Sequence, residues 1–162
     1  MKVYLGGPMF ERADIDYNLM LAEKLRQKGI EVYCPNENMQ INDKSRTNIT
    51  PEKIYRADID EMLTCNVFLC RISDDPGVMW EGGYMDCLSQ INSERYYGCV
   101  GLTTDIRWQT KPTPQASGVD NQSYYFNGFV IGGLKLSLGV YYDIDTLIDA
   151  LVEVSKKKEE KK

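Results

Sequence analysis

Short apolar runs alternate along the chain with longer segments in which apolar residues recur at helical spacing. Runs of the first kind are typical of buried strands, and segments of the second kind are typical of helices packed against a core. Strands are expected at residues 2–5, 30–34, 67–70, 97–102 and 137–142. Helices are expected at residues 15–28, 50–64, 79–91 and 124–134, with a last helix capped by Asp143 or Asp145. This alternation predicts an α/β fold: a doubly wound, mainly parallel five-stranded sheet with helices on both faces, in a flavodoxin-like or Rossmann-like three-layer arrangement.

Three connecting segments stand out between these elements. Gly6-Gly7-Pro8 follows the first strand, and its glycines let a ligand approach the main chain closely. Residues 35–49 are polar and lack periodicity, so we expect a long loop over the active face. Residues 103–122 are polar and contain prolines, and we expect an excursion or lid there. We expect a single domain over residues 1–154 and a solvated, charged tail over residues 155–162.

The stretch from Asp74 to Tyr84 directly follows the third predicted strand, at the end of a parallel strand where open α/β sheets bind ligands. Glu81 would lie in the first turn of the next helix, at the head of a stripe that otherwise faces the interior. Taken alone, this acid is most simply interpreted as one placed against the helix dipole. Such a position at a helix N-terminus would keep the Glu81 carboxylate ionised at neutral pH.

Asp58 is a second acid in an apolar stripe, four residues after Ile54 and four before Met62. By itself, an acid at such a position more simply lies at the edge of the core than in a site. However, the first strand with Tyr4, the helix with Asp58 and the stretch with Glu81 all converge at the carboxyl edge of the sheet. We therefore expect a carboxylate site at this edge.

The composition narrows the chemistry that such a site can perform. The chain has no histidine, which excludes Ser-His and Cys-His nucleophiles and histidine general bases. It contains neither GxGxxG nor a P-loop, so dinucleotide and Walker sites are not indicated. Acid, base or nucleophilic roles would therefore fall to carboxylates, Tyr, Cys or Lys. The five cysteines form no CxxC pair and indicate neither a disulfide framework nor a zinc site; they lie at positions 34, 65, 70, 87 and 99.

Charge and hydropathy bear on the partners. The net charge of -5 argues against binding to a nucleic acid polymer, because neutralising phosphates requires a basic face. The N-terminal apolar run is too short for a signal peptide or a membrane span. We expect a cytoplasmic protein that acts on small molecules, without a cofactor or a metal and without contact with a membrane.

Gly6-Gly7-Pro8 after the first strand, and Asp75 followed by Glu81-Gly82-Gly83-Tyr84, together resemble the nucleoside 2-deoxyribosyltransferase family. The resemblance extends from Val3 to about Leu147. It implies transfer of 2-deoxyribose between nucleobases in nucleoside salvage, with 2'-deoxynucleosides and free nucleobases as substrates. It also implies a homo-oligomer in which a neighbouring subunit completes the site.

The resemblance further implies roles for individual residues. Glu81 matches the nucleophile that attacks the anomeric carbon and forms a glycosyl ester. Asp58 matches the acid that gives a proton to the base, and Asp75 matches the acid that holds the sugar hydroxyl end. Tyr4 matches a tyrosine that hydrogen-bonds and orients the nucleophile. Asn127 matches an asparagine that reaches the 5'-hydroxyl from an adjacent subunit.

Further residues are expected to contact the substrate. Gly6 and Gly7 would line the site. Phe10, Met39 and Trp108 could stack on a base, although each could equally be part of the core. The polar region after the fourth strand is longer than a minimal fold needs, which leaves base selectivity open.

Two other functions are compatible with the same pattern. An N-glycoside hydrolase of deoxynucleosides or their 5'-monophosphates would use the same glutamate. A monophosphate would require a phosphate cradle, and the loop after the first strand has no hydroxyl there. A non-catalytic nucleotide-binding module is the second alternative. It is disfavoured because burying each of three converging carboxylates costs on the order of several kcal/mol.

Overall fold

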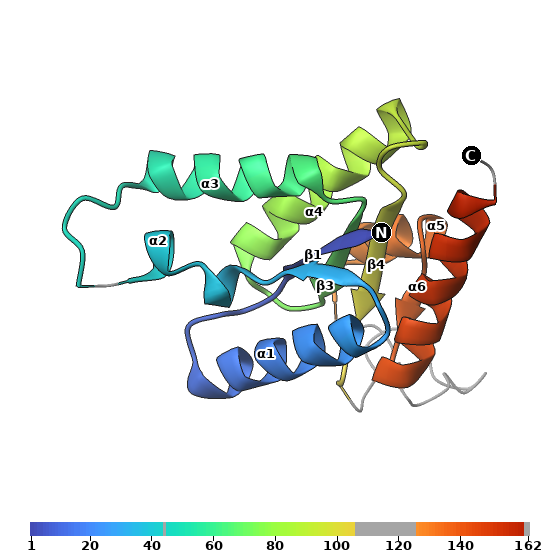
Figure 1. The fold of residues 1–162 in the computed structure, drawn as a ribbon, viewed down its shortest axis with the longest axis horizontal. Coiled ribbons are helices and arrows are strands. Elements are labelled where there is room, and N and C mark those ends of the chain that lie inside the picture. The colour runs from blue at the N-terminus through green and yellow to red at the C-terminus, as the bar shows by residue number, and fades with distance from the viewer. Residues whose placement is uncertain (44, 106–125, 161–162) are drawn as a thin grey trace.

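A computed structural model describes residues 1–43, 45–105 and 126–160 of the chain and shows a five-stranded sheet (Figure 1). The strands are β1 (Lys2–Gly6), β2 (Glu31–Tyr33), β3 (Val67–Arg71), β4 (Gly98–Leu102) and β5 (Val140–Tyr141). Their order is β2-β1-β3-β4-β5, and every neighbouring pair is parallel. This is the flavodoxin-like order, in which the chain reverses direction across the sheet after β2. The predicted fold class is confirmed.

Helices cover both faces of the sheet, as predicted (Figure 1). The long helices are α1 (Arg12–Gln27), α3 (Pro51–Thr64), α4 (Pro76–Ile91), α5 (Gly128–Leu136) and α6 (Ile144–Glu159). Helices α1 and α6 pack on one face, where buried aliphatic side chains of β1, β3 and β4 form one core cluster. Helices α3, α4 and α5 pack on the other face, over a cluster that contains Tyr4, Phe68, Cys70 and Cys99. None of the helices in the described part of the chain is both long and apolar enough to cross a membrane.

Local signals in the sequence explain several of the helix ends. The side chain of Thr50 accepts a hydrogen bond from the Lys53 amide and caps α3, with Pro51 at its first position. The side chain of Asp143 caps α6 by accepting from the Thr146 amide. Helix α1 ends before Gly29, which adopts a φ of 78° that favours glycine.

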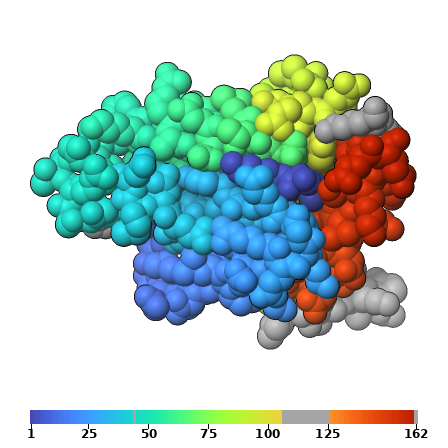
Figure 2. All heavy atoms as spheres, viewed as in Figure 1, coloured from blue at the N-terminus to red at the C-terminus, as the bar shows by residue number. Residues whose placement is uncertain are grey.

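Other expected boundaries were wrong. The segment at 35–49 is not a continuous loop, because it contains a 3-10 turn η1 (Pro35–Glu37) and a short helix α2 (Met39–Asn42). The last strand is only Val140–Tyr141, shorter than the expected 137–142. Helix α5 begins at Gly128 rather than at residue 124, and α6 continues through residues 155–159 of the expected tail. Most of the expected lid at 103–122 lies outside the described residues. The segment between β2 and α3 forms the end of the molecule opposite α6 (Figure 2).

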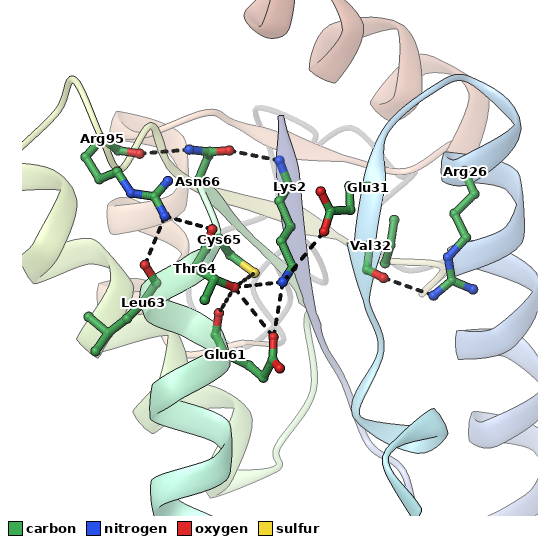
Figure 3. A network of polar contacts seen from close by, with 10 residues as sticks. All are labelled: Lys2, Arg26, Glu31, Val32, Glu61, Leu63, Thr64, Cys65, Asn66 and Arg95. Atoms are coloured by element: carbon green, nitrogen blue, oxygen red, sulfur yellow. Dashed lines mark hydrogen bonds and ion pairs between the residues drawn. The ribbon is translucent and has the colours of Figure 1, made fainter.

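The amino edge of the sheet carries a network of paired polar groups (Figure 3). The Lys2 ammonium lies 3.1 Å from a carboxylate oxygen of Glu61 and donates to the Thr64 hydroxyl at 2.7 Å. The Asn66 side chain accepts from the Lys2 amide at 2.8 Å and donates to the Arg95 carbonyl at 3.0 Å. The Arg95 guanidinium donates to the carbonyls of Leu63 and Thr64, which are exposed as acceptors at the end of α3. The charged groups of Lys2, Glu61 and Arg95 therefore each have a partner.

Candidate active site

Tyr4 and Glu81 meet at the face of the sheet covered by α3 and α4. Tyr4 lies in β1 and is fully buried, and its hydroxyl donates to Glu81 Oε1 at 2.8 Å. The Tyr4 ring lies beside the rings of Tyr33 in β2 and Phe68 in β3, with centroid distances of 5.2 Å and 5.8 Å. The phenol is therefore fixed by packing on both neighbouring strands. Its single proton orients one oxygen of the Glu81 carboxylate.

Glu81 does not lie in the first turn of its helix, and this corrects the prediction. Helix α4 begins at Pro76, and the side chain of Asp75 caps it by accepting from the amides of Gly77 and Val78 at 2.8 Å and 3.1 Å. The Asp-Pro pair is itself a helix-start signal, so the helix begins three residues earlier than its apolar stripe suggests. Glu81 therefore lies in the second turn, where the helix dipole has little effect on a carboxylate.

The expectation that a position at the helix N-terminus keeps Glu81 ionised at neutral pH was also wrong. Burial, against the lowering effect of the Tyr4 hydrogen bond and with smaller contributions from the negative charges of Asp58 and Asp75, raises the pKa of Glu81 to about 7. These effects of charge show that all three acids lie within one electrostatic environment. The site thus holds a carboxyl group that titrates near neutral pH, a property common at catalytic sites.

Asp58 lies in α3 and interacts electrostatically with both Tyr4 and Glu81. Burial raises its pKa to about 6, while the Tyr4 hydroxyl opposes that rise. Its Oδ1 atom is buried and has no hydrogen-bond partner among the described residues. Tyr4 has one hydroxyl proton and donates it to Glu81, so the Asp58 oxygen remains without a donor. A protonated Asp58 would hold its proton in the site, available to a ligand.

The carboxyl groups of Glu81 and Asp58 titrate as a coupled pair. Because each raises the cost of charging the other, their titrations belong to the pair. Between the pKa of about 6 for Asp58 and about 7 for Glu81, the pair carries about one proton. Because Glu81 has the higher pKa of the two, that proton lies more often on Glu81, and the state with Glu81 ionised and Asp58 protonated is the less populated of the two one-proton states. This state pairs one ionised carboxylate with one carboxylic acid.

Gly6 lies against the nucleophile candidate and leaves no room for a side chain. A Cβ atom at Gly6 would overlap the Phe68 ring and lie 3.2 Å from Glu81 Oε2. A Cβ atom at Gly82 would approach the opposite edge of the same ring at 3.3 Å. The absence of a side chain at Gly6 and Gly82 therefore leaves room for the Phe68 ring, and at Gly6 also for the Glu81 carboxylate. Gly7 lies one residue further, next to Arg71.

The remaining predicted residues are not brought to Glu81 by the described contacts. Phe10 and Met39 are 74% and 62% exposed, which excludes the interpretation that they belong to the core. Asn127 is exposed and caps α5, accepting from the Phe129 amide at 2.9 Å. Trp108 lies outside the described residues. Asp75 is near Glu81, but one of its oxygens is already used as the helix cap.

The packing of Tyr33 and Phe68 around Tyr4 was missed from the sequence. Strand register pairs Tyr4 with Tyr33 on one side and with Phe68 on the other. Each of these residues sits within a short apolar run, and an apolar run alone does not show which strand is its neighbour. The only available signal was the strand order expected of a doubly wound sheet, combined with the period of two along each strand.

The chain is therefore an α/β protein with a site at the carboxyl ends of its strands, and that site contains acids and a tyrosine. The family model described as nucleoside 2-deoxyribosyltransferase matches residues 3–147, so the chain belongs to that family and is a deoxyribosyltransferase enzyme. The substrates of this family are deoxynucleosides and bases. No curated protein matches the chain.

Solved structures that resemble this one include the following two. A conserved protein from Enterococcus faecalis V583 is 31% identical, with a TM-score of 0.77, and the match covers 94% of this chain and 97% of that chain. The 2-deoxyribosyltransferase from the psychrotolerant bacterium Bacillus psychrosaccharolyticus is 16% identical, with a TM-score of 0.62, and the match covers 91% of this chain and 90% of that chain. At that lower identity, the likeness shows a shared fold.

Proposed function

We propose that the enzyme exchanges the base of 2'-deoxynucleosides by a retaining double displacement through a covalent ester on Glu81. The observation that carries this proposal is the buried group of Glu81, Tyr4 and Asp58, which supports one ionised and one protonated carboxyl near neutral pH. Glycosidic bonds break through a state with positive charge at the anomeric carbon, which a nearby carboxylate stabilises and then captures.

In the first displacement, an oxygen of Glu81 attacks the anomeric carbon, and the carbon–nitrogen bond to the base breaks. The bonding electrons move to the base nitrogen, which takes a proton from Asp58. Oε1 is held by Tyr4, so Oε2, beside Gly6, is the oxygen free to attack. The products of this step are a free base and a deoxyribosyl ester on Glu81.

In the second displacement, a nitrogen of the incoming base attacks the anomeric carbon, and the ester carbon–oxygen bond breaks. Glu81 becomes a carboxylate again, and the proton of the incoming base passes to Asp58. Two inversions at one carbon give net retention. When water attacks in place of a base, the outcome is hydrolysis. The same site thus supports exchange in cytoplasmic nucleoside salvage, with hydrolysis as a side reaction.

The other predicted residues complete this proposal. Asp75 would use its remaining oxygen to accept from the sugar hydroxyl end, and Gly6 and Gly7 would form the floor beneath the sugar. Phe10 and Met39 would stack on the base, and their exposure leaves their apolar surface available to a ligand. These contacts are to a nucleoside and a free base, with no role for a nucleic acid polymer or a membrane.

We propose that the enzyme is a homo-oligomer in which Asn127 of one copy completes the site of another. A largely apolar groove of about 460 Å³ lies between α4 and α5 and includes Gly82, the residue after Glu81. Phe129 and Leu136 line this groove and are 92% and 91% exposed, so a second copy that covers them would also bring the N-terminus of its α5 close. Light scattering at the assay concentration tests this: a monomeric mass with full activity contradicts it.

The exchange assay tests the proposed function. Purified enzyme is given a 2'-deoxynucleoside and a second free base, and we expect the new deoxynucleoside with the same anomeric configuration. Acid-quenched enzyme incubated without acceptor should carry deoxyribose on the peptide that contains Glu81, as seen by mass spectrometry. Release of free sugar without exchange at any acceptor concentration would favour the hydrolase. Absence of both reactions would favour a binding module.

A further inference from the structure

Asn18 is a buried polar residue on the face of the sheet opposite Glu81. It lies in α1 and is 2% exposed. Among the described residues, Thr103 is the only other polar residue that is buried. A buried amide requires hydrogen bonds, because leaving its polar atoms unpaired is costly. The hydrogen-bond partners of Asn18 therefore show which segments its side chain holds together.

The Asn18 side chain joins three segments that precede or follow α1. Its amide nitrogen donates to the Pro8 carbonyl and to Asn36 Oδ1, both at 2.9 Å. Its oxygen accepts from the Arg71 guanidinium at 2.6 Å. The carbonyl of Pro8 can only accept and the guanidinium can only donate, so the orientation of the amide is fixed by its partners.

Each partner belongs to the carboxyl edge of a strand. Pro8 lies in the loop after β1, Asn36 lies in η1 after β2, and Arg71 is the last residue of β3. Asn36 also donates to the Met9 carbonyl at 3.4 Å, which is a second contact to the same loop. Arg71 is held in turn by Asp14 of α1 at 2.9 Å. The loop after β1 is thus tied to α1, to the turn after β2 and to the end of β3.

The tethered loop is the one that borders Glu81. Gly6 lies at its start, with Glu81 Oε2 beside it. Gly7 packs so closely that a Cβ atom there would lie 3.0 Å from the Arg71 side chain and 3.1 Å from Asn18 Oδ1. The position of this loop therefore sets the shape of the space above the free oxygen of Glu81.

We propose that Asn18 is a positioning residue for nucleoside binding, which holds the loop at Gly6–Met9 in its binding shape from the opposite face of the sheet. This inference rests on the proposed function, because it assumes that a deoxynucleoside occupies the space next to Glu81. Asn18 touches neither the reacting atoms nor Glu81. It acts through the main chain of the loop.

The variant Asn18→Asp tests this role with little change in volume. The aspartate still accepts from Arg71, but it cannot donate to Pro8 or to Asn36. If the loop is then ordered in only about a tenth of the molecules, the KM for the deoxynucleoside rises about tenfold at saturating acceptor base. The kcat should stay within about threefold of wild type, because the Tyr4–Glu81 hydrogen bond does not involve the loop.

Asn66→Asp is the matched control. Asn66 also uses one side-chain amide to bridge two backbone segments, but at the amino edge of the sheet. Its replacement should lower the melting temperature and leave the KM unchanged. Partial unfolding reduces the concentration of active enzyme and lowers the apparent kcat, so a raised KM in Asn18→Asp alone separates positioning from simple destabilisation.

A second variant covers the case in which Asn18→Asp does not fold. Asn36→Ala removes the acceptor for Asn18 and the donor to Met9 while leaving Arg71 in place, and it should also raise the KM. An unchanged KM in the folded variants, or an equal rise in Asn66→Asp, overturns the proposal. If the wild-type enzyme shows neither exchange nor hydrolysis, the proposed function has failed. Calorimetric affinities for the deoxynucleoside then decide, and equal values for wild type and Asn18→Asp overturn the positioning role.

Discussion

The acids at the two edges of the sheet have opposite surroundings. At the amino edge, Glu61 and Glu31 lie within ion-pair distance of Lys2, and an asparagine and an arginine satisfy nearby backbone groups. At the carboxyl edge, Glu81 and Asp58 are buried together, and no salt bridge in the described part of the chain pairs either of them with a cation.

This difference separates groups that hold the fold together from groups that are kept ready to react. A paired surface acid gains a little stability from its partner. A buried, unpaired acid costs stability when charged and titrates near neutral pH. Groups with such a cost cluster at functional sites, where their charge is used in chemistry. The comparison therefore assigns function to one edge and stability to the other, and three experiments test that assignment.

The largest expected effect is on activity when the carboxyl edge loses its nucleophile. Glu81→Ala should lower kcat/KM for exchange on the order of 10⁴-fold or more, because no covalent intermediate can form. Hydrolysis should fall with it. Glu61→Ala at the amino edge is the control and should retain the wild-type kcat/KM. Exchange by the Glu81 variant, measured by chromatography of the nucleosides, would contradict its role.

Loss of the proton donor should have a smaller effect that depends on pH. Asp58→Asn should lower kcat/KM on the order of 10²-fold for an ordinary base, and less for a donor whose base leaves without protonation. In wild type, kcat/KM should fall below pH 6 as the pair takes up a second proton and above pH 7 as the pair loses its last proton. The variant should lack the alkaline fall. Its remaining acid limb should follow the titration of Glu81 alone.

An alkaline fall of the same size in Asp58→Asn would assign that limb to another group. The measurement is a pH profile of kcat/KM with two donors that differ in leaving group. Equal losses for both donors would likewise count against Asp58 as the proton donor.

The smallest expected effect is on stability, and it should have opposite signs at the two edges. The pKa of Glu81 in the folded protein is about 7, above its ordinary value of 4.5. The folded state therefore binds the proton more tightly, and stability is lost as pH rises from 4.5 through 7. Glu81→Gln should thus be more stable than wild type by about 3 kcal/mol at pH 8.5 and nearly equal to it at pH 4.5.

Glu61→Ala should instead lower the free energy of unfolding by about 1 kcal/mol, with a smaller loss at high salt. Urea denaturation of both variants and wild type at the two pH values measures these differences. If Glu81→Gln were less stable than wild type at pH 8.5, the charged form of Glu81 would stabilise the fold, and the proposed difference between the two edges would be contradicted.

Much of the fold could be predicted because it depends on patterns that are local in sequence. The alternation of apolar runs with amphipathic segments gave the five parallel strands, and Thr50-Pro51, Gly29 and Asp143 marked helix ends correctly. The errors fell where tertiary contacts decide. Only two residues of the last strand pair with β4, and the polar segment after β2 gains short helical turns.

The site was predictable in its members but not in its electrostatics. The rule that ligands bind at strand ends brought Tyr4, Asp58 and Glu81 together, and the structure shows the Tyr4–Glu81 contact. The protonation of Glu81 was predicted wrongly, because its pKa depends on burial by residues far away in sequence. Asn18 was not singled out for a similar reason: its partners lie 10, 18 and 53 positions away.

The ring of Phe68 has a consequence for how sequences of this enzyme can vary. Gly6 and Gly82 approach the same ring from two elements, so the three positions divide one fixed volume between them. An alanine at Gly6 becomes sterically acceptable only with a smaller residue at position 68, and that smaller residue would loosen the stacking that holds Tyr4. Redesign of the space above Glu81 should therefore change these positions together. A compensating substitution at position 68 alone would loosen the packing of the tyrosine that orients Glu81.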